Sequence, residues 1–368
     1  MTSPTDAEAV AALAADLVRL DSRSSLSNLA VAERIEAALP GFEIERLDYA
    51  DASGVAKRAL VAHRGGPGGI ALSGHMDTVP DTGWTNDPWS GRVDADGVLH
   101  GLGSADMKGP VAACVVAARG LPADVPATLL ITTDEETTKQ GAALIAERSE
   151  LARRAALRGI VVAEPTRLAP IRGHRANINF EAVATGVQAH SSTGRGTNAN
   201  LALIPFLSAM RDLHERLRTD PGFRDPTYDP PFPDFNIVLD NHGTALNVTV
   251  PRATCRIKFR YTRAQDPAPV QRAVEEAASA AGLALFLTED GTPPELPADH
   301  PLVRAAEAAT GRTAGTVPFG TDASRLNAIA PCLVLGPGDI GVAHAPDEHV
   351  SLAELAAAVP LFRALMRG

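Results

Sequence analysis

Apolar and polar residues follow two different patterns along the chain, and the first pattern occupies roughly its opening half. Residues 6–20 carry apolar side chains at helical spacing, and Thr5 or Asp6 can cap the start of that helix. Short apolar runs that predict buried strands then alternate with stretches that predict helices. The expected strands are 42–47, 59–63, 69–73, 127–133 and 159–163, and the further expected helices are 28–39, 110–119 and 141–148. This alternation predicts a doubly wound, mainly parallel α/β sheet.

The pattern changes near residue 176. Residues 178–184 alternate between apolar and polar side chains, which is typical of a half-exposed strand. The expected elements that follow are a helix at 198–216, strands at 235–239, 245–250 and 254–261, a helix at 267–281 and a strand at 283–287. This order, in which one strand is ambiguous, predicts an α+β domain inserted into the first domain.

The chain is long enough for two domains. The expected division is a first domain in two parts, residues 1–175 and 291–368, with residues 176–290 inserted between them. The returning part should contain a helix at 301–310, a strand at 331–335 and a last helix that starts at Ser351.

The net charge and the cysteine pattern exclude several classes of protein. The formal net charge is −10 without any block of Lys or Arg, which argues against a nucleic-acid partner or an anionic membrane surface. No apolar run approaches the roughly 18 residues that a membrane helix needs, and no signal peptide is apparent. Cys114, Cys255 and Cys332 are far apart, as reduced thiols of a cytosolic protein often are. We therefore expect a cytoplasmic protein.

Ionisable side chains stand where three of the predicted strands end, before a predicted helix and in a late loop. Ligands of doubly wound sheets bind beyond the carboxyl ends of the strands, so these side chains are candidates for one site. They are His75, Asp106, Glu136, Glu164 and His344. Taken singly, His75, Asp106, Glu136 and Glu164 are better explained as polar strand ends or helix caps. Taken together, two imidazoles and three carboxylates suit Zn²⁺ or a similar divalent ion, and they exceed what one open catalytic zinc uses.

Two metals that share one carboxylate would need about this number of ligands and would leave room for a bridging water. Glu135 directly precedes Glu136 and is then available as the general base that takes a proton from the water.

Six stretches of the chain together resemble the di-zinc amidohydrolase family of acetylornithine deacetylase, succinyl-diaminopimelate desuccinylase, aminoacylase and glutamate carboxypeptidase. They occur in the order of the family and span nearly the whole chain. They are residues 73–80, 106–109, 133–136, 163–166, 189–192 and 343–348.

The resemblance implies two divalent ions per chain, most often Zn²⁺, with Co²⁺ or Mn²⁺ as alternatives. His75 and Glu164 would bind one ion, Glu136 and His344 would bind the other, and Asp106 would bridge them. His349 competes with His344, but His344 lies within the matching stretch Ala-His-Ala-Pro-Asp-Glu. Asp77 would orient His75, and Glu135 would be the base and later the acid toward the leaving amine. A cis peptide bond is expected between Asp106 and Met107.

The inserted domain resembles the lid and dimerisation domain of the family, which implies a homodimer. His190 would reach the active site of the partner subunit and stabilise the oxyanion. Asn247 and Arg260 match positions that bind the substrate, although Arg260 could instead form a cross-strand ion pair. Gly320 and Thr321 lie in a stretch that resembles a substrate-contacting loop.

The resemblance implies hydrolysis of the amide bond of an N-acyl amino acid or a similar small amide. Residues 317–323 and 336–338 look most similar to acetylornithine deacetylase. A dipeptidase or carboxypeptidase with the same site, and a relative that binds small molecules without catalysis, are the alternatives. The non-catalytic alternative predicts a lost ligand or base, and none is lost. The chain departs from the family at Leu102, at Ala163, and at Thr138 and Lys139, which stand where a Gly often follows the double Glu.

Overall fold

The computed structural model describes residues 4–367, which form two compact units. The first unit contains the chain up to Gly173, together with Pro294–Thr316 and the chain from Thr321 onward. The second unit contains His174–Pro293 and Val317–Gly320. The sequence pattern had placed the segment 317–320 with the returning part of the first domain. It belongs with the second unit, where Gly320 lies close to the carbonyl of Arg175.

The first unit alternates strands and helices as expected. Its elements, in chain order, are α1 (Asp6–Val18), α2 (Leu29–Ala37), β1 (Glu43–Ala50), β2 (Ala56–Arg64), β3 (Ile70–His75), β4 (Arg92–Val93), β5 (Val98–His100), α3 (Lys108–Arg119), β6 (Ala127–Thr132), α4 (Gln140–Arg148), α5 (Glu150–Ala155), β7 (Gly159–Val162), β8 (Ile171–His174), α8 (Pro301–Thr310), β13 (Gly315–Val317), α9 (Ala323–Leu326), β14 (Cys332–Val334), β15 (His349–Ser351) and α10 (Leu352–Arg367). Thr5 caps α1 in a capping box with Glu8. The sequence pattern missed α5 and the shortest strands, because elements of so few residues are too short to show a periodic pattern.

The main sheet of the first unit has the strand order β1-β2-β6-β3-β7-β14-β8-β13 among the described residues. Its centre is parallel, because β3 pairs in parallel with β6 and β7, and β14 pairs in parallel with β7. Antiparallel pairs extend the sheet on both sides, between β1, β2 and β6 and between β14 and β8. The predicted α/β class with a mainly parallel central sheet is therefore confirmed.

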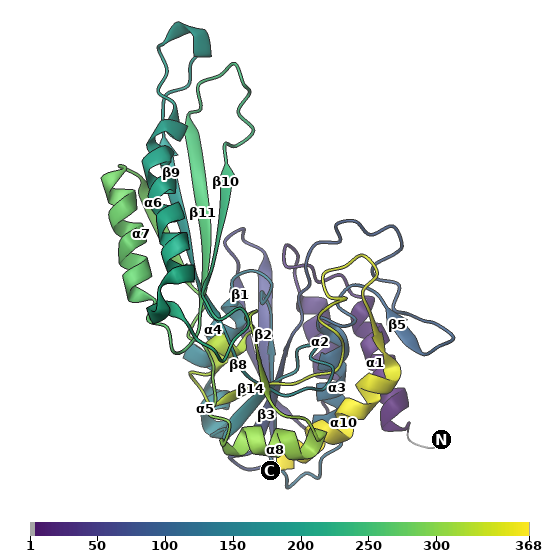
Figure 1. Cartoon of the computed structure of the whole chain (residues 1–368). Coiled ribbons are helices and arrows are strands. Elements are labelled where there is room, and N and C mark those ends of the chain that lie inside the picture. The colour runs from purple at the N-terminus through teal and green to yellow at the C-terminus, as the bar shows by residue number, and fades with distance from the viewer. Residues whose placement is uncertain (1–3, 368) are drawn as a thin grey trace. The chain divides into compact units, whose positions relative to one another are not determined.

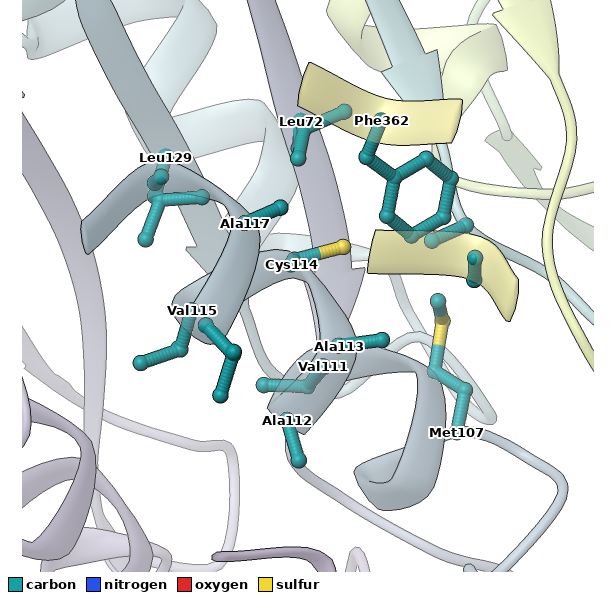
Figure 2. Close-up of a cluster of buried hydrophobic side chains, with 14 of the residues drawn as sticks. Leu72, Met107, Val111, Ala112, Ala113, Cys114, Val115, Ala117, Leu129 and Phe362 are labelled. Carbon is teal, nitrogen blue, oxygen red and sulfur yellow. The ribbon is translucent and has the colours of Figure 1, made fainter. Parts of the chain in front are cut away.

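Helices cover both faces of this sheet (Figure 1). On one face α1, α3 and α10 pack against one another, and α3 and α10 contact β3, whereas α4 and α5 contact β2 from the other face. Figure 2 shows Val111 and Cys114 of α3 in one apolar cluster with Leu72 of β3 and Phe362 of α10. A side chain at Gly74 would come within 2.7 Å of Val111, so the glycine permits this close packing just before β3 ends.

The second unit is an antiparallel sheet with two helices. Its elements are β9 (Ala176–Thr185), the short 3₁₀ helices η1 (Ser191–Thr193) and η2 (Pro221–Phe223), α6 (Ala199–Thr219), β10 (Asp234–Asp240), β11 (Arg252–Tyr261), α7 (Ala268–Ala280) and β12 (Ala284–Glu289). The strand order is β10-β11-β9-β12. A second apolar cluster joins α6 and α7 to this sheet, with Phe180, Phe206 and Phe259 fully buried.

The strand predicted at 245–250 is wrong. This segment belongs to the loop between β10 and β11, and its pairing is limited to an isolated bridge between His190 and Val248 within the described residues. The segment bonds instead to residues 189–191: Thr249 N–H donates to the Ala189 carbonyl at 2.9 Å, and the Asn247 carbonyl accepts the N–H of Ser191 at 3.0 Å. Leu246 is fully exposed.

No helix within residues 4–367 is both long enough and apolar enough to cross a membrane.

Candidate metal centre

Asp106 stands at the centre of the predicted ligands in the first unit. Its Oδ1 lies 3.1 Å from His75 Nε2, and its Oδ2 lies 3.3 Å from His344 Nε2. His344 Nε2 is also 3.0 Å from Glu136 Oε1. Two groups of potential ligand atoms, each within 4.8 Å of one another, share Asp106: one contains His75 and Glu164, and the other contains Glu136 and His344. The fold thus brings all five predicted ligands together, with one oxygen of Asp106 toward each histidine.

The elements of the parallel sheet place these side chains. His75 is the last residue of β3, Glu136 follows β6 and Glu164 follows β7, so the three lie at the carboxyl ends of adjacent strands. Asp106 precedes α3, and its peptide bond to Met107 is cis, as expected. His344 comes from the loop after β14 and has a left-handed φ of 62°.

Asp77 connects one histidine to the loop that bears Glu135 and Glu136. His75 Nδ1 donates to the Asp77 carbonyl at 2.9 Å, which turns Nε2 toward Asp106. The Asp77 carboxylate accepts the backbone N–H groups of Glu135 at 3.1 Å and Glu136 at 3.3 Å. Ser24 Oγ donates to the same carboxylate at 2.8 Å. Asp77 therefore orients His75 and the Glu135–Glu136 backbone together.

The sequence pattern missed a buried cluster behind this loop. Lys57 is almost completely buried, and its Nζ lies 2.9 Å from Asp134 Oδ1. Lys57 Nζ also donates to the carbonyls of Ser24 at 2.6 Å and Leu26 at 2.8 Å, and Tyr49 Oη donates to Asp134 Oδ2 at 2.6 Å. Nothing in the sequence around Lys57 signals this role, because its partners come from other elements.

Glu348 is a second residue that the sequence pattern missed. It is 1% exposed, and its Oε1 accepts the backbone N–H groups of Ala105 and Asp106, both at 2.9 Å. Burial raises the pKa of Glu348 to about 7, and repulsion from Asp106 contributes to the same shift. The signal was present, since Glu348 ends the stretch Ala-His-Ala-Pro-Asp-Glu that contains His344.

Burial and mutual hydrogen bonds shift the pKa values of the clustered side chains. Burial, and then repulsion from Asp106, raise the pKa of Glu164 well above its usual range. Burial raises the pKa of Glu136 to about 7 despite a hydrogen bond with His344. Hydrogen bonds to Asp106 and Glu136 raise the pKa of His344 to about 11. Burial would lower the pKa of His75, but hydrogen bonds to Asp106 and Asp77 raise it instead.

This cluster fits divalent cations. Divalent ions would supply positive charge to this group of buried carboxylates. A ligating histidine is neutral and a ligating carboxylate is ionised, so metal binding would compete with protons at these groups. The nitrogen and oxygen donors are those that Zn²⁺ and similar ions accept.

His349 lies outside this cluster. It belongs to β15, its Nδ1 donates to the carbonyl of Asp347 at 2.7 Å, and its ring centroid lies 5.8 Å from that of His100. Among the described residues, it belongs to none of the groups that could hold a metal.

Three of the predicted substrate and lid residues lie in the second unit. His190 is exposed at the start of η1, where its Nδ1 accepts the backbone N–H of Ser192 at 3.3 Å. Asn247 is exposed nearby, and its carbonyl accepts the N–H of Ser191 at 3.0 Å. Arg260 forms an ion pair with Asp234, its direct partner on β10, which is the alternative left open by the sequence.

Gly320 and Thr321 fall on opposite sides of the division between the units. Gly320 belongs to the second unit, whereas Thr321 is buried in the first unit. Thr321 Oγ1 accepts the N–H of Ala323 at 3.1 Å, so Thr321 supports the start of α9. The next residue, Asp322, is also buried and accepts a hydrogen bond from Thr132 Oγ1.

Comparisons with known proteins agree with this site. The family model of peptidase family M20/M25/M40 matches residues 71–368. The acetylornithine deacetylase of Proteus mirabilis is 33% identical over 349 residues, which are 90% of this chain and 88% of that protein. The acetylornithine deacetylase of Myxococcus xanthus is 33% identical over 371 residues, which are 94% of each chain.

Solved structures share the fold. An M20 family metallo-carboxypeptidase from Sulfolobus solfataricus superposes with a TM-score of 0.73 at 15% identity, over 96% of this chain and 97% of the other. A dipeptidase from Saccharomyces cerevisiae superposes with a TM-score of 0.73 at 15% identity, over 97% and 94%. The chain belongs to peptidase family M20/M25/M40 and is a metal-dependent hydrolase of amide bonds.

Proposed function

We propose that this enzyme removes the acyl group from a small N-acyl amino acid, with N-acetylornithine as the first compound to test. The observation that carries the proposal is the position of Asp106 between His75 and His344, with Glu136, Glu164 and Glu135 close by. The choice of acyl amino acid is supported by relatives that are one third identical over about nine tenths of the chain and are named acetylornithine deacetylases.

Two divalent ions, most often Zn²⁺, would occupy the centre, with Co²⁺ or Mn²⁺ as alternatives. His75 and Glu164 would hold one ion, Glu136 and His344 the other, and Asp106 would hold both. When bound, such ions lower the pKa of a water molecule and polarise the amide carbonyl.

Glu135 would supply the proton transfers. It lies beside the ligand Glu136, and a carboxylate oxygen of Glu135 is within 4.8 Å of ligand atoms of His75 and Glu136. From this position its carboxylate would accept a proton from the attacking water and later deliver it to the leaving amine. Asp77 would keep Glu135 in place by accepting its backbone N–H.

The second unit would contribute to the substrate site and to assembly. We propose a homodimer formed through this unit, in which His190 stabilises the oxyanion in the active site of the partner subunit. Asn247, Gly320 and Thr321 would contact the substrate. Arg260 would bind the substrate carboxylate only by exchanging its ion pair with Asp234.

We also propose that the enzyme acts in the cytoplasm. Cys114, Cys255 and Cys332 are free and buried, which suits a reducing compartment.

A substrate screen tests the proposed function. The enzyme, loaded with Zn²⁺, would be assayed on N-acetyl and N-succinyl amino acids and on dipeptides. Turnover of N-acetyl amino acids, with a kcat/KM above that for dipeptides, is the expected result. Preference for dipeptides would identify a peptidase with the same site. No turnover of any of these compounds would favour a relative that binds small molecules without catalysis.

A further inference from the structure

The loop between β6 and α4 folds back on itself and returns Lys139 to the proposed base. The backbone N–H groups of residues 137–139 all donate to the carbonyl of Asp134, at 3.3, 3.0 and 2.7 Å. Asp134 and Lys139 adopt left-handed φ values of 61° and 53°. At Gly141, a side chain would come within 2.6 Å of the Thr133 carbonyl, so α4 starts tightly against the end of β6.

This turn places a lysine ammonium on the carboxylate of Glu135. Lys139 Nζ lies 2.9 Å from Glu135 Oε1 and donates to the Glu135 carbonyl at 3.4 Å. The Lys139 side chain is 11% exposed and that of Glu135 is 9% exposed. An ion pair shielded from water in this way holds its geometry far better than an exposed pair does.

The helix start alone does not explain a lysine at position 139. Lys139 is the N-cap of α4 and forms no side-chain cap hydrogen bond. A cation is unfavourable at the positive end of a helix, and Ser, Thr, Asp or Asn are preferred at this position. The left-handed backbone also disfavours a residue other than glycine, asparagine or aspartate. Three local preferences are therefore violated at one residue, which is typical of a functional position.

Asp322 is a second buried carboxyl group that interacts electrostatically with the Lys139 ammonium. Asp322 is 1% exposed and lies in the first unit with Lys139 and Glu135. Burial, and then repulsion from Glu135, raise the pKa of Asp322 to about 7, whereas the charge of Lys139 opposes this shift. Lys139 thus carries positive charge close to two buried carboxyl groups, Glu135 and Asp322.

We propose that Lys139 is a positioning residue for the hydrolysis, which fixes one oxygen of Glu135 so that the other accepts the proton of the attacking water. This inference rests on the proposed function, because it requires Glu135 to be the base. No bond to Lys139 forms or breaks, and the proton passes from the water to Glu135 and then to the leaving amine.

The test replaces Lys139 in the metal-loaded enzyme and measures kcat, KM, bound metal and thermal unfolding. K139M should lower kcat roughly 10- to 100-fold, because a misplaced catalytic group costs rates of this order, while KM and bound metal stay within twofold of wild type. K139R keeps the cation and should recover much of the kcat. K139G suits the left-handed backbone but lacks the ammonium, so it should lose as much kcat as K139M does.

An exposed ion pair provides the matched control. Arg153 pairs with Glu150 on α5 at 2.8 Å, with side chains that are 54% and 76% exposed, so R153M should leave kcat and KM unchanged. K139G replaces K139M in the comparison if K139M unfolds. A kcat within twofold of wild type in K139M or K139G would overturn the inference.

The variant E135Q separates this inference from the proposed function. Adding K139M to an inactive E135Q enzyme should cause no further loss of residual kcat, because Lys139 acts through Glu135. A further loss would show that Lys139 acts elsewhere and would overturn the inference. Full activity of E135Q would instead overturn the proposed base, whereas an inactive E135Q beside a fully active K139M would overturn the role of Lys139 alone.

Discussion

Glu348 Oε1 lies 2.9 Å from the backbone nitrogen of Asp106, although 242 residues separate the two along the chain. The same oxygen accepts the N–H of Ala105. The carboxylate of Glu348 thus fixes the backbone of the residue whose own carboxylate faces both His75 and His344. Glu348 is not a proposed ligand, but its hydrogen bond holds the backbone of Asp106, the ligand that the two proposed metal sites share.

The variant E348A should destabilise the protein and weaken its metal binding. Two buried N–H groups would lose their acceptor, so the free energy of unfolding should fall by about 2–4 kcal/mol. E348Q keeps an acceptor oxygen and should lose much less. Urea unfolding of the metal-loaded E348A and E348Q proteins measures their free energies of unfolding. Equal stability of E348A and wild type would show that these hydrogen bonds do not stabilise the protein.

The variants H344A and H349A should separate the two neighbouring histidines. H344A removes a proposed ligand, so bound metal should fall from about two ions per chain toward one, with loss of turnover. H349A should keep the wild-type metal content and kcat, because its ring contacts His100 and not the ligand cluster. Metal analysis of both proteins, purified without chelator, decides between them, and loss of metal in H349A alone would reverse the assignment.

The variant D77N should weaken metal binding without removing a ligand. The replaced carboxylate lies 3.5 Å from His75 Nδ1 and accepts the backbone N–H groups of Glu135 and Glu136, and such partners typically contribute 10- to 100-fold to metal affinity or activity. Competition with a chromogenic chelator measures the change. S24A, which removes a single hydrogen bond to Asp77, should have a smaller effect, and an unchanged affinity in D77N would contradict the role given to Asp77.

Mixing two inactive variants tests the proposed dimer. If His190 completes the active site of the partner subunit, H190A and E135Q chains can form dimers with one intact site. After subunit exchange, an equal mixture should recover about a quarter of the wild-type activity, since half of the dimers are mixed and each has one intact site. A mixture that stays inactive, although exchange is shown by a tag, would place His190 in its own subunit or outside catalysis.

The sequence predicts that three of the clustered side chains lie close together, because they stand at or after the ends of apolar runs. His75, Glu136 and Glu164 stand at the end of or after apolar runs that predict buried strands, and adjacent parallel strands bring their carboxyl ends together. The spacing of apolar residues therefore predicts where in the sheet these side chains lie. The fold class of the first unit follows from the same signal.

The supporting residues were not predictable in this way. Lys57, Lys139 and Glu348 act through contacts that depend on how distant segments or a tight turn fold. The local sequence of Lys57 looks ordinary, and Glu348 is marked only by its place at the end of the stretch that contains His344. The strand expected at 245–250 failed for a related reason. Its apolar residues fit a strand, but periodicity does not show that this segment bonds to residues 189–191 instead of to a strand of the sheet.

The most direct test of the central claim is the kcat of E135Q on an N-acyl amino acid that the wild type hydrolyses, measured together with bound metal. The amide replaces the proposed base with a group of the same shape that cannot accept the proton. The kcat should fall by about 10²–10⁴-fold while the bound metal stays at the wild-type level. Wild-type turnover by metal-loaded E135Q would contradict the account.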